Sequence, residues 1–243
     1  TVETLIHNAD LALYRAKANG GNVHIAYDPS LLHQAEERHR IEADLRAALG
    51  AGELEVHYQP VVVAKTEHIV QMEALLRWNN AERGLVNVSG QQLRDADFVP
   101  MVVSALTNSG LAPQRLEIEV NESIFDQEES VVRAVLDQII ALGCTVALDD
   151  FGTGHSSLSY LRELRFSAIK IDRSFVRDAT KGHAESLAII RAVVAVAESL
   201  EMSTTAEGVE TLAELELIRR LGCCKAQGFR FGKAMSAETV AQI

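Results

Sequence analysis

The sequence predicts an α/β fold, a (β/α)8 barrel of the TIM type with one irregular strand. Eight apolar runs of strand length are bounded by charged residues or glycine, and segments with helical periodicity lie between most of them. With 243 residues, 47% of them hydrophobic, the chain is long enough to bury one large core. Repeated strand-helix alternation favours a parallel sheet, and eight strands favour its closure. The expected strands are 55–63, 72–78, 85–89, 115–120, 145–150, 168–172, 203–209 and 225–231.

The first part of the chain stands outside this alternation. It contains an amphipathic helix that ends near Gly20 and Gly21 and is followed by a short strand, and an acidic helical segment then precedes the first barrel strand. We therefore expect residues 1–28 to be the helix-strand remnant of a preceding domain, residues 29–49 to be a connector helix, and residues 50–243 to be the barrel.

The irregular strand is the third. Only seven residues separate Trp78 from Val86, whereas a parallel crossover with its helix needs about 10–12 residues or more. Either the protein has lost the helix between these two strands, or a segment is missing between about residues 80 and 86. We favour the missing segment, because an open barrel would expose a wide apolar edge.

Composition narrows the function classes. A net charge of -11 argues against binding to a DNA or RNA polymer, because a phosphate backbone needs a basic surface. The three cysteines, two of them adjacent at Cys223 and Cys224, fit neither a disulfide framework nor paired zinc ligands, so we expect reduced thiols in the cytoplasm. No apolar run approaches the roughly 20 residues of a membrane span, so we expect no membrane contact here, although an upstream region of the full-length protein could tether it.

Polar side chains gather where the predicted strands end. The carboxyl ends of parallel barrel strands open on one face, where the active sites of such barrels lie. A single strand-end carboxylate is more often an exposed group or a structural ion pair than a catalyst. A polar group on each of seven strands is different, because buried charge must be paired or coordinated. The residues that should converge are Glu73, Asn87, Glu119, Asp149, Asp150, Lys170, Asp172, Glu207 and Gln227.

The residue types select the chemistry of this site. Carboxylates with an amide oxygen, and without histidine or cysteine, suit Mg²⁺ or Mn²⁺ rather than zinc or copper. The adjacent pair Asp149 and Asp150 can serve two ions, since one carboxylate can bridge while its neighbour holds the second. Paired ions serve in-line displacement at phosphorus, so we expect a phosphodiester hydrolase. Ca²⁺ should bind the same oxygens but inhibit turnover, because its looser coordination places the attacking water poorly.

Several blocks of sequence resemble one family closely. They are QP at Gln59-Pro60, MEALLRW, VNVS, EVNES, LDDFGTGHSSLSYL, IKIDRSFV, AEGVET and QGF. Together they resemble the EAL domain of cyclic di-GMP phosphodiesterases over roughly residues 40–240. The segment ADLALYRAKANGGN resembles the C-terminal end of a GGDEF domain, the diguanylate cyclase fold that often precedes EAL in one chain.

The resemblance implies a role for each matching residue. Glu73, Asn87, Glu119 and Asp149 would hold the first metal, and Asp149 and Asp150 the second. Glu207 would lie near the second metal or act as general base on the attacking water, and Lys170 would contact that water or the scissile phosphate.

The resemblance also implies which residues bind the substrate and which residue anchors a loop. Arg77 and Leu75 would contact the dinucleotide, Gln59 and Asp172 would help to seat it, and Gln227 would support the metal-water cluster. Glu122 would anchor the loop FGTGHSS, in which Gly152 and Gly154 permit a sharp turn. In the family this loop takes part in dimerisation, so a homodimer is expected.

Three functions remain open at this point. The first is hydrolysis of cyclic di-GMP to linear pGpG in bacterial second-messenger signalling. The second is a catalytically weak EAL domain that acts as a cyclic di-GMP receptor; such domains typically lack part of the metal set, whereas every member is present here. The third is a scaffolding barrel whose carboxylates form structural networks, which the hard-oxygen cluster with Lys170 and Glu207 disfavours.

Overall fold

The chain forms two compact units in the computed structural model. The structure describes residues 2–18, 24–28, 30, 40–41, 44–45, 47–80, 84–87, 93, 95–122, 124, 129–152, 161 and 163–243. The smaller unit comprises Thr1–Glu55 and Leu76–Val88, and the larger comprises Val56–Leu75 and Ser89–Ile243. Strands β1 and β2 each begin in one unit and end in the other.

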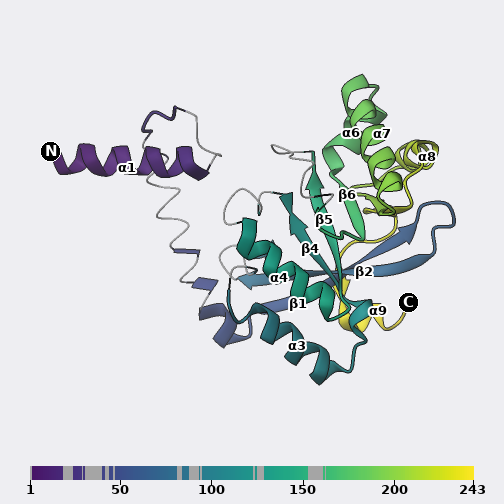
Figure 1. The fold of residues 1–243 in the computed structure, drawn as a ribbon, viewed down its shortest axis with the longest axis horizontal. Coiled ribbons are helices and arrows are strands. Elements are labelled where there is room, and N and C mark those ends of the chain that lie inside the picture. The colour runs from purple at the N-terminus through teal and green to yellow at the C-terminus, as the bar shows by residue number, and fades with distance from the viewer. Residues whose placement is uncertain are drawn as a thin grey trace. The chain divides into compact units, whose positions relative to one another are not determined.

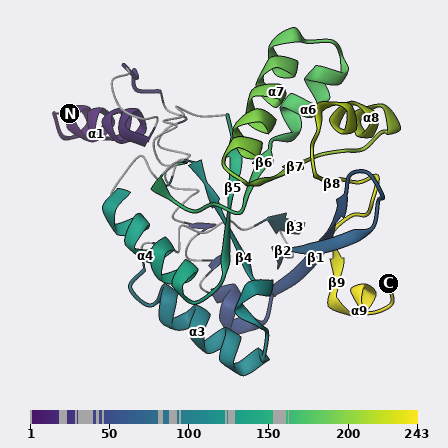
Figure 2. The ribbon, with the colours of Figure 1, turned by 45° about the vertical axis from the view of Figure 1, so that its right-hand side comes forward.

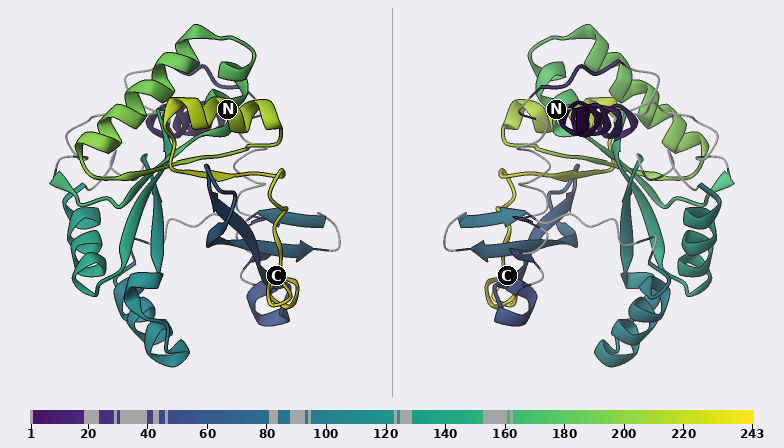
Figure 3. Two further views of the ribbon diagram at one scale, coloured as in Figure 1. Left: turned by 90° about the vertical axis from the view of Figure 1, so that its right-hand side faces the viewer. Right: turned by 90° about the vertical axis from the view of Figure 1, so that its left-hand side faces the viewer.

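The larger unit is built on a curled sheet with helices on its outer face (Figure 3). Backbone hydrogen bonds join its strands in the order β2-β1-β8-β7-β6-β5-β4, and β9 pairs with β1. The strands are β1 (Leu54–Val63), β2 (Ile69–Asn80), β4 (Glu117–Asn121), β5 (Thr145–Phe151), β6 (Ala168–Ile171), β7 (Ser203–Ala206), β8 (Lys225–Gln227) and β9 (Met235–Ser236). This curled, half-barrel arrangement confirms the predicted TIM-like fold class.

Strands β4 to β8 are neighbours and all parallel, as the sequence predicts. Their inward and outward faces are both covered, which is why they read as continuous apolar runs: Leu148, Ile169 and Ile171 are fully buried. Parallel pairing aligns the carboxyl ends of these strands, so Asn121 lies opposite Asp149 and Lys170 opposite Thr205.

The helices follow the strands as expected for β/α units. They are α1 (Val2–Ala18), α3 (Phe98–Ser109), the 3-10 helix η2 (Pro113–Arg115), α4 (Glu129–Ala141), α6 (Arg173–Thr180), α7 (Ala184–Ser199), α8 (Leu212–Leu221) and α9 (Ala237–Val240). Helices α6, α7 and α8 lie side by side, and α7 packs on β6 and β7 (Figures 1 and 2). In the part of the chain that the structure describes, no helix is long and apolar enough to cross a membrane.

Three of the described strand pairs depart from an all-parallel barrel. Strand β1 runs antiparallel to β8, with Val61 opposite Gln227, and antiparallel to the short strand β9. In the smaller unit β2 and β3 (Gly84–Asn87) form an antiparallel hairpin, with Arg77 opposite Asn87 and Asn80 opposite Gly84. Only residues 81–83 join these two strands, and so short a link permits a hairpin but no parallel crossover. The irregularity predicted at the third strand is therefore present, and it takes the form of an antiparallel hairpin.

The N-terminal part differs from prediction in one respect. Helix α1 is present, and the described residues between 40 and 51 are mainly helical, as expected for the connector. Residues 24–28, where a short strand was predicted, form none. A strand needs a neighbour for its backbone hydrogen bonds, and no described strand pairs with this segment.

Candidate active site

A buried lysine forms the centre of the site. Lys170 lies on β6 and is 3% exposed. Its Nζ donates to Glu119 Oε2 at 2.6 Å, lies 2.7 Å from Glu207 Oε1, and lies 3.5 Å from Glu73 Oε1 and 3.7 Å from Asp149 Oδ1. One ammonium group thus holds four carboxylates together. All five side chains belong to the larger unit.

The fold brings these carboxylates together from separate strands. Glu73 lies on β2, Glu119 on β4, Asp149 near the end of β5, and Glu207 directly after β7. Side chains alternate between the two faces of each of these strands, so the register of the strands fixes which residues face the barrel interior. The predicted convergence of these residues is confirmed.

The charged groups of the cluster shift one another's pKa values. Burial alone would lower the pKa of the Lys170 ammonium, but Glu207, Glu119, Asp149 and Glu73 together raise its pKa above the ordinary value. Burial raises the pKa of Glu119 to about 8, although Lys170 opposes this shift. Burial likewise raises the pKa of Glu207 to about 7 against the opposing pull of Lys170. The single positive charge of Lys170 therefore does not balance the negative charge of the carboxylates around it.

The adjacent aspartates lie at an irregularity of β5, where the register with β6 shifts between Leu148 and Phe151. Asp150 adopts a left-handed conformation with φ of 55°, and its backbone N–H donates to Asp149 Oδ1 at 2.9 Å. Asn121 Nδ2 donates to Asp150 Oδ2 at 2.8 Å. Burial, and then Asp149, raise the pKa of Asp150. Gly152 has φ of 90°, which confirms the predicted need for glycine at that position, while Gly154 lies outside the described residues.

The donor set fits a divalent cation. Asp149, Asp150 and Glu207 each offer an oxygen within 4.8 Å of the others. Gln227 is 4% exposed, and its Oε1 accepts no hydrogen bond from any described residue, so a buried acceptor is open to a cation or a water. Oxygen donors and excess negative charge suit a hard ion such as Mg²⁺ or Mn²⁺.

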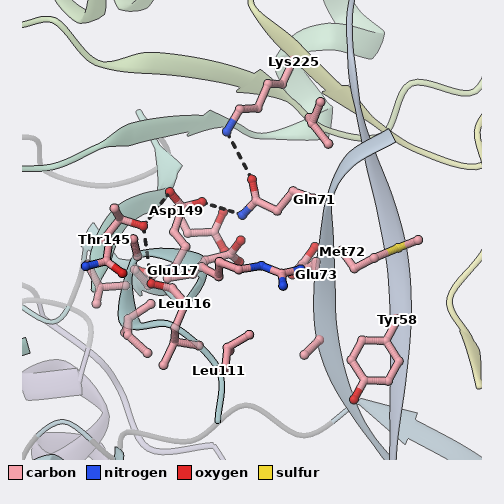
Figure 4. A pocket seen from close by; sticks show the side chains of 18 of the residues that line it. Tyr58, Gln71, Met72, Glu73, Leu111, Leu116, Glu117, Thr145, Asp149 and Lys225 are labelled. Carbon is pink, nitrogen blue, oxygen red and sulfur yellow. Dashed lines mark hydrogen bonds between the residues drawn. The ribbon is translucent and has the colours of Figure 1, made fainter. Parts of the chain in front are cut away.

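A cavity of about 1510 Å³ opens beside the cluster. Glu119, Asp150 and Asn121 form part of its wall, as do Glu73 and Asp149 (Figure 4). Every residue that lines it belongs to the larger unit. The carboxylates are therefore accessible to a large ligand.

Two predicted glutamines also lie beside the cluster. Gln227 Nε2 donates to Glu73 Oε2 and to Gln59 Oε1, the latter at 3.3 Å. Gln59 Nε2 in turn donates to the Gly232 carbonyl at 3.0 Å. This chain of hydrogen bonds links Glu73 to Gln227 and Gln59.

The other predicted residues fall in different places. Asp172 caps α6, since its carboxylate accepts from Ser174 N at 2.9 Å, and Leu75 is half-buried on β2. Arg77 is buried in the smaller unit and donates to the Leu76 carbonyl at 3.2 Å. The structure describes only the backbone of Asn87, opposite Arg77 on the β2–β3 hairpin.

The predicted loop anchor is in a suitable place. Glu122 follows the last residue of β4 and is 5% exposed, so it is no exposed loop carboxylate. Residues 153–157 of the loop that it is predicted to anchor lie outside the described residues. Sequence reasoning missed Asn121, whose position at the strand end between Glu119 and Glu122 was the available signal.

The sequence profile of the EAL domain family matches residues 42–86 and 82–234. The chain is similar to the bifunctional diguanylate cyclase/cyclic di-GMP phosphodiesterase MucR of Pseudomonas aeruginosa, with 34% identity over 283 aligned residues that cover 98% of this chain and 41% of that protein. It is also similar to the cyclic di-GMP phosphodiesterase NbdA of the same organism, with 32% identity over 278 residues, 96% of this chain and 35% of that protein.

A solved structure described as the PaMucR phosphodiesterase in complex with c-di-GMP matches the fold with a TM-score of 0.76. That match has 33% identity and covers 83% of this chain and 99% of that one. The chain spans less than half the length of the two curated relatives. Because the family profile covers most of the residues that build the curled sheet and its carboxylate cluster, the chain belongs to the EAL domain family.

Proposed function

We propose that this chain is a metal-dependent phosphodiesterase that hydrolyses cyclic di-GMP to linear pGpG in bacterial second-messenger signalling. The observation that carries the proposal is the cluster around the buried Lys170, in which half-buried carboxylates from three strands and from the residue after β7 converge beside a large cavity. Two relatives named as cyclic di-GMP phosphodiesterases, and the PaMucR structure solved in complex with c-di-GMP, support this substrate.

The proposed metal ligands are those that the resemblance to the family implies. Glu73, Glu119 and Asp149, with Asn87, would hold one ion, and Asp149 and Asp150 would share a second. Bound Mg²⁺ or Mn²⁺ would supply Lewis acidity to the phosphate and a nucleophilic water at neutral pH. A solved relative described as a manganese/cy-diGMP complex of BlrP1 from Klebsiella pneumoniae, 26% identical, supports a divalent cation in this fold.

Glu207 would act as the general base, and Lys170 would supply positive charge near the phosphate. A base works best when its pKa lies near the working pH, and the pKa of Glu207 is raised to about 7. Glu207 would accept the proton of the attacking water. Lys170, 2.7 Å from Glu207, would orient that carboxylate and attract the scissile phosphate.

The residues proposed to bind the substrate are those that the resemblance to the family implies. Leu75, Arg77, Gln59 and Asp172 would contact or seat the dinucleotide, and Gln227 would hold Glu73 and the metal-water cluster. Glu122 would anchor the loop after β5. A homodimer through that loop is part of the proposal.

The domain layout is also proposed. Residues 1–28 would be the end of a GGDEF domain, residues 29–49 a connector, and residues 50–243 the EAL barrel. We infer that a segment is missing between about residues 80 and 86. The alignment with MucR runs over 283 residues although this chain has 243, and the family profile matches in two pieces that meet at this point.

A cyclic di-GMP receptor of low activity is the alternative. One observation favours it: Asn87, a proposed metal ligand, lies on an antiparallel hairpin instead of a parallel barrel strand. The proximity of Glu73, Glu119 and Asp149, each within 4 Å of Lys170 Nζ, supports the enzyme.

Variants separate the two functions. Glu73→Ala should abolish turnover, because it removes a metal ligand that Lys170 and Gln227 orient. Glu207→Gln should retain most of its affinity for cyclic di-GMP while losing turnover, because the amide keeps the shape but not the basicity. Ca²⁺ should support binding with little turnover. If Glu207→Gln hydrolyses cyclic di-GMP as fast as the parent protein, Glu207 is not the general base. If the parent protein binds cyclic di-GMP without hydrolysing it, the receptor is favoured over the enzyme.

A further inference from the structure

A second polar cluster lies inside the larger unit, next to the carboxylates. Gln71 Nε2 on β2 donates to Glu117 Oε1 on β4 at 2.6 Å, and Lys225 Nζ on β8 donates to Gln71 Oε1 at 3.1 Å (Figure 4). Glu117 Oε2 accepts from Ser167 Oγ at 2.8 Å and from Thr145 Oγ1 at 3.4 Å. Both ends of the Gln71 amide and both Glu117 oxygens are therefore used.

The bond between Gln71 and Glu117 joins strands that the sheet leaves apart. In the hydrogen-bonded order of the larger unit, β2 and β4 stand at opposite ends. No pairing between them occurs among the described strands. The side chains of Gln71 and Glu117 thus provide a direct link across the sheet opening that the backbone does not.

The three residues stand in register with the candidate active site. Gln71, Glu117 and Lys225 each precede an active-site residue by two positions on the same strand: Glu73, Glu119 and Gln227. Residues two apart on a strand point to the same face and lie roughly 6.5 Å apart. A shift of β2 against β4 at the Gln71–Glu117 bond would therefore be carried to Glu73 and Glu119.

Packing alone does not fix the distance between these strands. Gln71, Glu117, Thr145 and Lys225 all line the cavity that contains the carboxylates. Where a cavity separates two walls, close-packed side chains cannot hold them at a set spacing. A hydrogen bond, which is directional and short-ranged, can do so.

We propose that Gln71, Glu117 and Lys225 form a brace that sets the separation of Glu73 and Glu119, and so act as positioning residues for the first metal ion. This inference rests on the proposed function, because it assumes that those two carboxylates share an ion. It assigns a role to polar residues that the proposed mechanism does not otherwise use. Groups that orient metal ligands typically contribute about 10–100-fold to metal affinity.

The test measures the affinity of the protein for Mn²⁺ by electron paramagnetic resonance, in the absence of nucleotide. Gln71→Met keeps the length of the side chain but removes both hydrogen bonds, so we expect Mn²⁺ affinity to fall by about 10–100-fold. Glu117→Leu should do the same, whereas Glu117→Gln retains an acceptor for Gln71 and should restore most of the affinity. Gln138→Met is the matched control, because the Gln138 side chain is exposed on α4 and donates to the Ala134 carbonyl within its own helix.

Thermal melts distinguish a brace from a general contribution to stability. Parent-like Mn²⁺ affinity in folded Gln71→Met, even with a lowered melting temperature, would overturn the proposal. If Gln71→Met does not fold, Lys225→Met tests the same link, since it removes only the bond to Gln71 Oε1; unchanged affinity there would also overturn it. A parent protein that binds Mn²⁺ but does not hydrolyse cyclic di-GMP would refute the proposed function and leave the brace standing.

Discussion

At the scale of single residues, Lys170 explains how four carboxylates can lie close together within the larger unit. Its ammonium is 3% exposed and within 4 Å of all four, so it supplies the positive charge that the cluster needs in the absence of a cation. Bringing like charges together in a medium of low dielectric constant is costly unless they are compensated. Lys170 is therefore a structural residue as well as a proposed catalytic one.

Replacing Lys170 by methionine tests this compensation. Removing one partner of a buried ion pair typically costs about 3–5 kcal/mol of unfolding free energy, because the remaining charges are left without a counterion. We expect Lys170→Met to lower the urea midpoint by a corresponding amount, and Mg²⁺ to recover part of the loss. Lys181→Met is the control, since Lys181 is exposed beside Asp178 and its loss should change stability by about 0.5 kcal/mol or less. Equal midpoints for Lys170→Met and the parent would contradict the account.

Single residues also mark the limits of sequence reasoning. Glu119, Lys170 and Glu207 could be identified because each is a charged residue within a predicted strand whose carboxyl end should open on the active-site face. Gln71, Glu117 and Lys225 were missed because a polar residue near the start of a strand resembles ordinary alternation with a solvent-facing side. Only the three-dimensional closure of β2 toward β4 gives them a common position.

At the scale of elements, the segment after β7 connects the site to a well-capped helix. Thr211 caps α8: its hydroxyl accepts from Glu214 N at 3.2 Å, and Glu214 Oε2 accepts from Thr211 N at 2.8 Å and from Glu210 N at 2.9 Å. This capping box fixes the chain four residues after Glu207.

Thr211→Ala should therefore destabilise the protein by about 1 kcal/mol, because it removes a side-chain acceptor from the first turn of α8. Urea unfolding measures the change. Thr211→Ser keeps the hydroxyl and should stay close to the parent. A Thr211→Ala protein as stable as Thr211→Ser would mean that the hydroxyl makes no net contribution to the cap.

Strand direction was the feature of the elements that could not be predicted. Apolar patterning identified β4 to β8 and the helices between most of them, because both faces of a parallel sheet are buried. The antiparallel pairing of β1 with β8 leaves the same pattern in the sequence as parallel pairing would. The short link between β2 and β3 indicated an irregularity correctly, but its hairpin geometry came only from the structure.

At the scale of the whole molecule, the candidate site lies within one compact unit. The carboxylates, Lys170, Gln227, the brace and the cavity all belong to the larger unit, whereas Arg77 and Asn87 belong to the smaller. The larger unit therefore contains most of the proposed metal ligands and the proposed base. It can be tested for metal-dependent chemistry directly.

The most direct measurement is chromatography of cyclic di-GMP incubated with the protein and Mg²⁺ or Mn²⁺. The account predicts that linear pGpG forms with either ion, disappears when a chelator is added, and returns when the ion is restored in excess, because the carboxylates that converge on Lys170 need a divalent cation to activate water. Undiminished formation of pGpG in the presence of chelator would contradict the metal-dependent mechanism.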